Sequence, residues 1–464
     1  MTQKSISVPP GTTEIENYAF EGCSNLESII IPEGVTTIGY DAFKGCTSLK
    51  SVILPQSLKE ICGGAFQECT GLVSITLPPN TEEIGFYAFY GCTALESITI
   101  PRNVNTIEEA ALSECSNLKK VIINEGTTII EKSAFSGCSS LESITIPEGV
   151  TTIGEDAFSY CTNLKSIRLP KSLTKIQGII FDDCTGIESI VVDEGNKVYD
   201  SRNGCNAIIE TASGMLIAAC SNAVIPEGVT GVGLGAFDYA ENLKSIAIPK
   251  GVTRFESFPN NRVLESIVVE EGNSVYDSRG GCNAIIETAT DILIAGCAST
   301  IIPQGIKAIG RGAFDGSKKL NEITIPDSVA DIGEWAFFEC SGLKSISIPY
   351  RVTAIKDFTF CHCSGITRVE IPGNIKTIGD YAFEGCTGIE SVTIEQGLKS
   401  IGEEAFGSCN NLKHVTLPPG IETIDEYAFL NSNSLVTISI PASEENHYRS
   451  MLPKKLHSAI TVRE

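Results

Sequence analysis

The segment "IPEGVTTIGYDAFKGCTSLKSVILP" at residues 31–55 returns, almost unchanged, as "IPEGVTTIGEDAFSYCTNLKSIRLP" at residues 146–170. The copies lie 115 residues apart, which is five times 23 residues. A repeat of this length is typical of a solenoid, because one unit cannot bury its own apolar side chains and must stack on its neighbours. The period therefore predicts the fold before any local structure is considered.

Cysteine marks the period most clearly. Around it each unit reads C-x-x-L-x-x-I-x-I-P-x-x-V-x-x-I-G-x-x-A-F-x-x-C, and we call the recurring position the cysteine slot. Twelve of the 18 cysteines occupy this slot at intervals of 23 residues within two series: Cys23, Cys46, Cys69, Cys92, Cys115, Cys138, Cys161 and Cys184, then Cys340, Cys363, Cys386 and Cys409.

Each unit predicts one strand and one compact turn region. The part L-x-x-I-x-I-P alternates apolar and polar residues and ends at a proline, which is typical of a short strand. The part I-G-x-x-A-F-x-x-C has apolar residues three and four apart, which favours one or two helical turns. Counting the residue that ends the strand in each copy, from Pro9 to Pro441, predicts 19 strands in one parallel sheet.

From about Ser5 to Pro441 the pattern resembles the 23-residue leucine-rich repeats of the BspA-like, treponemal type. The resemblance implies an α/β fold: a right-handed leucine-rich repeat solenoid with a curved parallel sheet and short helical turns on its convex side. It also implies a bacterial surface or secreted protein that adheres to host proteins or other cells. Residues 1–441 form the predicted solenoid, and residues 442–464, where the pattern stops, form a predicted C-terminal cap.

Two segments interrupt the rhythm, residues 196–220 and 273–297, and they are copies of each other. Each predicts a β-hairpin inserted into one coil. Symmetric pairing about a turn centred between residues 212 and 213 sets Cys205 opposite Cys220, and the same arithmetic sets Cys282 opposite Cys297. The two pairs are candidate disulfides, with free thiols as the alternative; a zinc site made by all four would require the hairpins to converge.

The slot cysteines predict buried free thiols. Stacked coils hold equivalent atoms about 4.8 Å apart, whereas the Cβ atoms of a disulfide lie about 3.8 Å apart. Ala240, Ser317 and Ser432 take the same slot, as small residues can in a packed column but not in a ligand set. The sequence therefore predicts neither a metal site nor a cofactor site here.

The "CHC" at residues 361–363 is interpreted in the same register. Cys363 occupies an ordinary slot, while Cys361 falls where other units have Glu21, Lys44, Gln67 or Glu384, which predicts an exposed position on the convex side. We therefore expect neither catalysis nor metal binding there.

Composition excludes several other functions. The chain has four histidines and no H-E-x-x-H, and no catalytic set converges, so we predict that it is not an enzyme. A net charge of −23 argues against a nucleic-acid partner. No apolar run reaches the roughly 18 residues of a membrane span, and "MTQKSISVPP" has neither a basic n-region nor an apolar h-region.

The outward side of the predicted strands carries mostly serine and threonine, so departures from that composition are the candidate binding face: Lys120, Arg168, Arg368, Glu370 and His414. We predict a non-enzymatic protein-binding or adhesion module that needs no cofactor, is monomeric, and is directed at a host extracellular matrix or cell-surface protein. The alternative is an intracellular scaffold in the cytoplasm, where reduced cysteines are normal.

Overall fold

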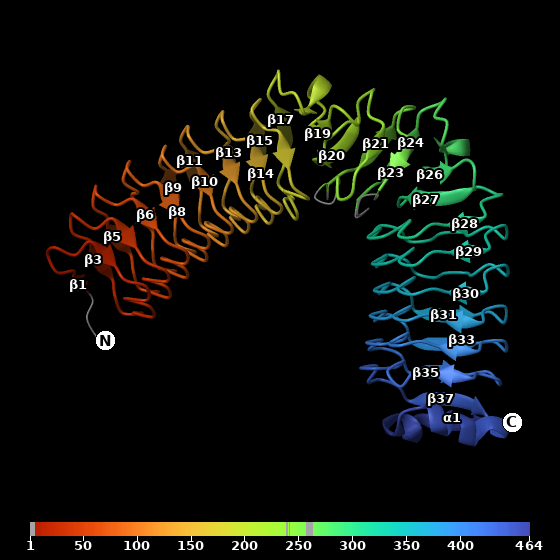
Figure 1. Ribbon diagram of the computed structural model, residues 1–464. Helices are drawn as coiled ribbons and strands as arrows, with labels where there is room; N and C mark the ends of the chain where they lie inside the picture. The colour runs from red at the N-terminus through yellow and green to blue at the C-terminus, as the bar shows by residue number, and fades with distance from the viewer. Residues whose placement is uncertain (1–4, 238–239, 241, 257–262) are drawn as a thin grey trace. The chain divides into compact units, whose positions relative to one another are not determined.

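The computed structural model describes residues 5–237, 240, 242–256 and 263–464. The chain divides into two compact units, unit 1 (residues 1–240 with 255–257) and unit 2 (residues 241–254 with 258–464). In each unit, successive coils of the chain place short parallel strands side by side (Figure 1). Both units are therefore parallel-strand solenoids.

The predicted strands form the first ladder of unit 1. They fall into two parallel sheets, the first six strands and the last three, and each starts with a serine or a lysine. They are β1 (Ser5–Ser7), β3 (Ser28–Ile30), β5 (Ser51–Ile53), β7 (Ser74–Ile75), β9 (Ser97–Ile100), β11 (Lys120–Ile123), β13 (Ser143–Thr145), β15 (Ser166–Leu169) and β17 (Ser189–Val192).

A second ladder, which we did not predict, runs through the T-x-I part of each coil. Its strands are only two residues long, too short to give an alternating pattern. In unit 1 they are β2 (Glu14–Ile15), β4 (Thr37–Ile38), β6 (Glu60–Ile61), β8 (Glu83–Ile84), β10 (Thr106–Ile107), β12 (Ile129–Ile130), β14 (Thr152–Ile153), β16 (Lys175–Ile176) and β21 (Gly231–Val232).

Unit 2 repeats both ladders. The first contains β22 (Ser245–Ile248), β24 (Ser266–Val269), β31 (Arg368–Ile371), β33 (Ser391–Ile394), β35 (His414–Thr416) and β37 (Thr437–Pro441). The second contains β28 (Ala308–Ile309), β29 (Asp331–Ile332), β30 (Ala354–Ile355), β32 (Thr377–Ile378), β34 (Ser400–Ile401) and β36 (Thr423–Ile424), and β23 (Arg254–Phe255) lies between β22 and β24 in the chain. The predicted strands that end at Pro226, Pro303, Pro326 and Pro349 are not strands in the structure, and no feature of their residues explains this.

Successive coils are in register, as the period predicts. Ser28 pairs with Ser51 and Ile29 with Val52, a shift of 23 residues. The phenylalanines consequently stack ring on ring, with centroids 5.2 Å apart for Phe43 and Phe66. Each buried ring contributes about 1.5–3 kcal/mol through burial, and neighbouring aromatic rings add about 0.5–1.5 kcal/mol.

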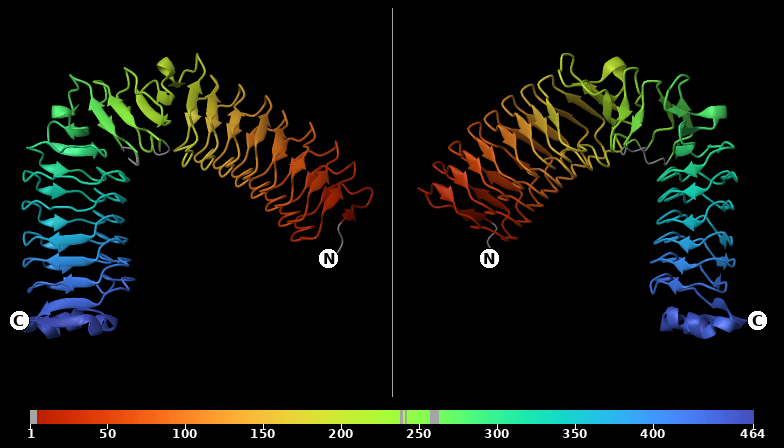
Figure 2. Two further views of the ribbon diagram at one scale, coloured as in Figure 1. Left: turned by 180° about the vertical axis from the view of Figure 1, so that it is seen from behind. Right: turned by 45° about the vertical axis from the view of Figure 1, so that its right-hand side comes forward.

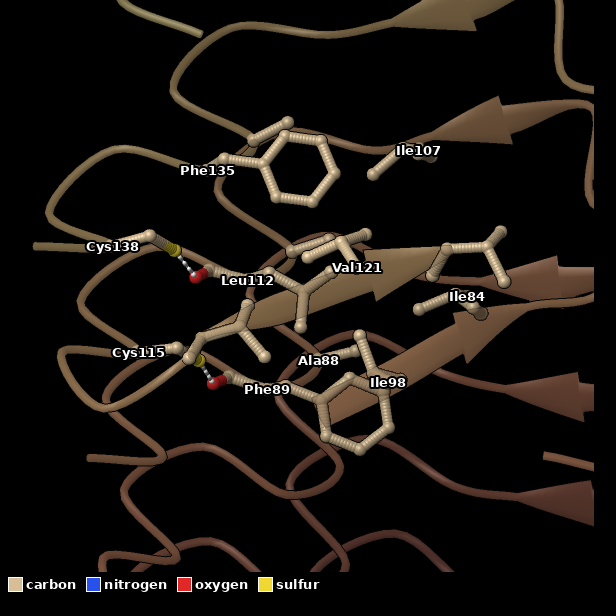
Figure 3. Close-up of a cluster of buried hydrophobic side chains, with 14 of the residues drawn as sticks. Ile84, Ala88, Phe89, Ile98, Ile107, Leu112, Cys115, Val121, Phe135 and Cys138 are labelled. Carbon is tan, nitrogen blue, oxygen red and sulfur yellow. Dashed lines mark hydrogen bonds between the residues drawn. The ribbon is translucent and has the colours of Figure 1, made fainter. Parts of the chain in front are cut away.

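Leu112 takes the place of a phenylalanine in this core. Figure 3 shows it between Phe89 and Phe135, beside the thiols of Cys115 and Cys138. All five side chains are fully buried. The smaller leucine interrupts the column of rings but leaves the apolar interior of unit 1 continuous.

The prediction of helical turns in each coil is wrong, because these segments form tight turns. The N–H of Phe20 donates to the C=O of Ala42 in the next coil, 2.7 Å away, while the N–H of Cys23 donates to the C=O of Phe20 in its own coil. Tyr18 and Gly22 have left-handed φ values of 61° and 66°. An α-helix needs bonds from each N–H to the fourth residue before it, so a segment that shares its donors with the next coil forms tight turns instead.

The two hairpin insertions are confirmed. In unit 1 they comprise β18 (Tyr199–Asp200), the 3₁₀ turn η1 (Arg202–Gly204), β19 (Ala207–Glu210) and β20 (Met215–Ala219); in unit 2, β25 (Tyr276–Asp277), η2 (Arg279–Gly281), β26 (Ala284–Glu287) and β27 (Ile292–Gly296). β19 and β20 are antiparallel, and β20 then pairs in parallel with β21. The returning strand thus takes the place of a second-ladder strand, and the coil continues.

The C-terminal residues of unit 2 leave the repeat. They form η3 (Ala442–Glu444), α1 (Glu445–Met451), η4 (Lys454–Ala459) and β38 (Ile460–Arg463). β38 pairs in parallel with β37, and α1 lies on the terminal coil (Figure 2). Tyr448 of α1 is fully buried, and its hydroxyl donates to the C=O of Pro418.

Candidate binding surface

The predicted residues of unit 1 point outward but do not come together. Lys120 starts β11 and is aligned with Ser97, whereas Arg168 lies in β15 in the row of Thr145. Both side chains are exposed, and the Arg168 guanidinium forms an ion pair with Asp193. Two residues in different rows and two coils apart do not form a common site.

The predicted residues of unit 2 do share one face. Arg368 of β31, Ser391 of β33 and His414 of β35 form one outward row. The Arg368 guanidinium lies 2.8 Å from the carboxylate of Glu370, two residues along the same strand. An exposed ion pair of this kind contributes about 0–1 kcal/mol, so it leaves the face polar, shallow and without an anchor.

The slot thiols belong to the interior. Eleven of the slot cysteines are buried, and their thiols donate to the C=O of the residue 26 positions earlier, at 2.8–3.3 Å. Burial raises the pKa of the Cys115 and Cys161 thiols to about 12. The prediction of buried thiols is confirmed for these cysteines, and protonated thiols of this kind are poor nucleophiles.

The hairpin cysteines are buried free thiols in the structure. A bulge between Ile208 and Ile209 shifts the pairing by one residue, so the N–H of Cys220 donates to the C=O of Asn206. We had predicted symmetric pairing that set Cys220 opposite Cys205, and the bulge makes that register wrong. Cys282 and Cys297 follow the same pattern across a bulge between Ile285 and Ile286. The disulfides themselves stay a prediction.

Unit 2 carries a row of aromatic rings that the sequence analysis missed. Trp335, Phe358 and Tyr381 lie in the turns that follow β29, β30 and β32, and we call them the aromatic row. The ring centroids are 4.1 Å apart for Trp335 and Phe358, and 4.8 Å apart for Phe358 and Tyr381. Phe338 extends the cluster, 4.8 Å from Trp335. All four side chains are half-buried, and the Phe358 ring is stacked between those of Trp335 and Tyr381, which cover both of its faces.

The aromatic row lies where the backbone has an unusual conformation. The residue two positions before the core phenylalanine has a left-handed φ in each of these coils, 60° at Trp335, 57° at Phe358 and 57° at Tyr381. In unit 1 the same position is held by Asp156 and Gly64, which adopt this conformation readily, and also by Tyr18 and Tyr87. Three aromatic residues at intervals of 23 therefore tolerate a conformational cost, and this spacing is the signal that could have revealed the row.

An acidic groove lies beside the row. Its volume is about 520 Å³, and it is lined by residues 377–380, 400–403 and 423–426. Four carboxylates belong to it: Asp380, Glu403, Asp425 and Glu426. Asp380 directly precedes Tyr381 of the aromatic row, and the charge of Glu426 raises the pKa of Tyr427. This part of unit 2 thus combines aromatic anchors with negative charge.

Comparison with known proteins identifies the family. A family model described as "BspA type Leucine rich repeat region (6 copies)" matches residues 2–119, 82–205, 216–279, 295–396 and 336–452. These ranges cover most of the chain, which therefore belongs to the BspA-type leucine-rich repeat proteins. The match is to a repeat family whose solenoids serve as binding scaffolds, and no enzyme family is matched.

Three solved structures align with most of this chain. A leucine-rich repeat protein from Eubacterium ventriosum is 21% identical over 93% of this chain and 91% of its own, with a TM-score of 0.43. A leucine-rich cell surface protein from Faecalibacterium prausnitzii is 22% identical over 100% and 92%, with a TM-score of 0.41. The pneumococcal vaccine antigen PcpA is 17% identical over 99% and 94%, with a TM-score of 0.41.

Among curated proteins, none matches this chain. Within the described residues, none of the helices has the length and apolar composition that a membrane span requires.

Proposed function

We propose that this chain is a non-enzymatic protein-binding module of a bacterial surface or secreted protein, and that it adheres to a basic patch on a host or cell-surface protein. The aromatic row carries the proposal. Trp and Tyr are the side chains that most often dominate the energy of protein interfaces, because they bury a large apolar area at little cost in side-chain entropy. Half-buried rings in a rigid repeat are already held in place for a partner.

The charge of the surface indicates the partner's chemistry. The four carboxylates of the acidic groove and a net charge of −23 favour a partner rich in lysine and arginine. An arginine side chain can also lie over an aromatic face, an interaction worth about 0.5–2 kcal/mol. Long-range attraction of this kind mainly accelerates association and is weakened by salt.

The intracellular alternative rested on the many reduced cysteines. The structure weakens that argument, because the slot thiols are buried and donate to backbone carbonyls. Such thiols stay unpaired in an oxidising medium as well as in the cytoplasm. A signal sequence encoded upstream of Met1 would support the proposed location, and its absence from the gene would support the alternative.

The test is binding of the full chain to immobilised fibronectin, laminin, collagen and mucin. We expect saturable binding to at least one of these proteins, weakened at least tenfold when Trp335, Phe358 and Tyr381 are all changed to serine. Ser133 stands at the same position with a φ of 55°, so serine fits this backbone. Tyr18→Ser, at the same position in unit 1 with a φ of 61°, is the matched control and should bind as the wild type does.

A second variant examines the charge. Asp380→Asn combined with Glu403→Gln should slow association and reduce its dependence on salt. If the wild-type chain binds none of the four proteins, the adhesion proposal is abandoned. If the triple serine variant binds as tightly as Tyr18→Ser, the aromatic row is not the contact.

A further inference from the structure

Three potential metal ligands meet on the turn side of unit 2. They are the thiol of Cys361, the imidazole of His362 and the carboxylate of Glu384, with one donor atom from each lying within 4.8 Å of the others. The Cys361 thiol is 3.2 Å from Oε2 of Glu384, and Nε2 of His362 is 3.3 Å from the same oxygen. Cys361 is only 2% exposed, which overturns our prediction of an exposed position.

The three side chains meet because equivalent positions of adjacent coils lie next to each other. Cys361 and Glu384 hold equivalent positions in adjacent coils, and the N–H of His362 donates to the C=O of Glu384 at 2.7 Å. The Glu384 carboxylate therefore lies over the thiol and covers it. Other units carry large polar residues at this position, and the ends of those side chains reach solvent. The side chain of Cys361 is shorter and stays beneath its neighbour Glu384.

We propose that Cys361, His362 and Glu384 bind a divalent transition metal ion, with Zn²⁺ as the best fit. Thiolate, imidazole and carboxylate are the usual protein ligands of Zn²⁺. Tetrahedral coordination with bonds of about 2.0–2.3 Å sets neighbouring donors roughly 3.3–3.6 Å apart, close to the spacing found here. Binding replaces the thiol proton, which passes to solvent, so affinity falls as the pH is lowered.

The surroundings leave room for an ion and for a fourth ligand. A Cβ atom at Gly385 would come within 2.1 Å of Nδ1 of His362, so the glycine makes space for the imidazole ring. The edge of that ring packs against Phe338, with centroids 5.8 Å apart. The imidazole is 49% exposed, which gives an ion access from solvent and a water molecule the remaining position.

One further carboxylate, that of Glu339, lies near the site. Glu339, one coil before His362, donates its N–H to the C=O of Cys361 and carries a carboxylate 3.5 Å from Lys318. Cys62 offers a comparison with Cys361. Burial raises the pKa of the Cys62 thiol to about 12, and this thiol donates to the carboxylate of Glu60 at 3.3 Å. Cys62 thus has a carboxylate but lies outside any described cluster of three ligands, which makes it a matched control.

The experiment measures metal binding by the full chain. After dialysis against Zn²⁺ we expect one equivalent bound per chain, and Co²⁺ in its place should give the near-ultraviolet charge-transfer absorption of a cobalt thiolate. Cys361→Ser should abolish that absorption, while His362→Gly and Glu384→Gln should each weaken binding at least tenfold. Cys62→Ser should bind as the wild type does.

Each of the three variants of the proposed ligands installs a residue already found at that position elsewhere: Ser136, Gly137 and Gln67. A thermal unfolding midpoint close to that of the wild type will show that each variant is folded. Absence of stoichiometric binding to the wild type, or equal binding by Cys361→Ser, would overturn the proposal. The adhesion test is independent, because it uses variants of other residues and no metal.

Discussion

At the scale of single residues, two serines in the cysteine slot differ in whether their buried hydroxyl group has a hydrogen-bond partner. Ser432 keeps the hydrogen bond of the thiols, since its Oγ donates to the C=O of Phe406 at 2.7 Å and accepts the N–H of Cys409. Ser317 stands in the same slot after the second hairpin, where the carbonyl 26 residues earlier belongs to the insertion. Among the described residues its fully buried Oγ has no hydrogen-bond partner.

This contrast gives a prediction with its own control. Ser432→Ala should lower the free energy of unfolding by about 1–2 kcal/mol, because it removes a satisfied buried hydroxyl and leaves the N–H of Cys409 unpaired. Ser317→Ala should leave the stability unchanged or raise it, because it removes a hydroxyl that is buried without a partner. Urea denaturation of the two variants would measure the difference, and equal losses would contradict this account.

At the scale of elements, the thiol column couples stability to pH. Burial favours the neutral thiol, so the pKa of Cys115 rises to about 12 in the folded chain, while an exposed cysteine in the unfolded chain has a pKa of about 8.5. The unfolded chain thus loses its thiol protons first as the pH rises. The stabilising effect of the column is fully present below about pH 8.5 and declines toward pH 12.

We therefore expect the free energy of unfolding to fall above pH 8.5. Each buried thiol contributes about 1.4 kcal/mol per pH unit within that range. Denaturation at pH 7, 9 and 10 would measure the slope. Replacing Cys138 by alanine, the residue at slot 240, should reduce the slope by one thiol's share. A stability that is flat from pH 8 to 10 would show that the column stays protonated even when unfolded.

The same burial predicts slow alkylation of the native protein. Iodoacetamide reacts with the thiolate, and a buried thiol with a pKa of about 12 provides almost none at neutral pH. We expect the partly exposed Cys23 to react first and the buried slot cysteines to react only when the chain opens. Peptide mapping after timed labelling would show the order, and rapid labelling of Cys138 in native protein would contradict it.

At the scale of the whole chain, the ends of a solenoid need cover. We propose that residues 442–464 cap the core of unit 2, where Tyr448, Leu452 and Ala459 are buried against the last coils. Nη2 of Arg463 also donates to the C=O of Leu417, 2.7 Å away. A coil without a neighbour exposes one side of its apolar interior, so the segment contributes to stability in proportion to the area it covers.

Tyr448→Ala should consequently lower the free energy of unfolding by about 3–5 kcal/mol, because it opens a cavity in the cap. Tyr448→Phe should cost only about 1–2 kcal/mol, because it removes one hydrogen bond and keeps the ring. Chemical denaturation followed by circular dichroism would measure both changes. A Tyr448→Ala variant as stable as the wild type would show that the last coils stand without the cap.

The sequence by itself determined the solenoid, because a period of 23 residues leaves the apolar side chains of each coil no other place for burial. It determined the in-register columns and the buried slot thiols for the same reason, and it determined the two hairpins through the segments that interrupt the period. Tertiary structure alone decided the rest. Donors shared between coils turned the predicted helical turns into tight turns, and bulges moved Cys220 and Cys297. Stacking of equivalent positions then assembled the aromatic row and brought Glu384 over Cys361, because contacts across coils join residues 23 apart that no local pattern connects.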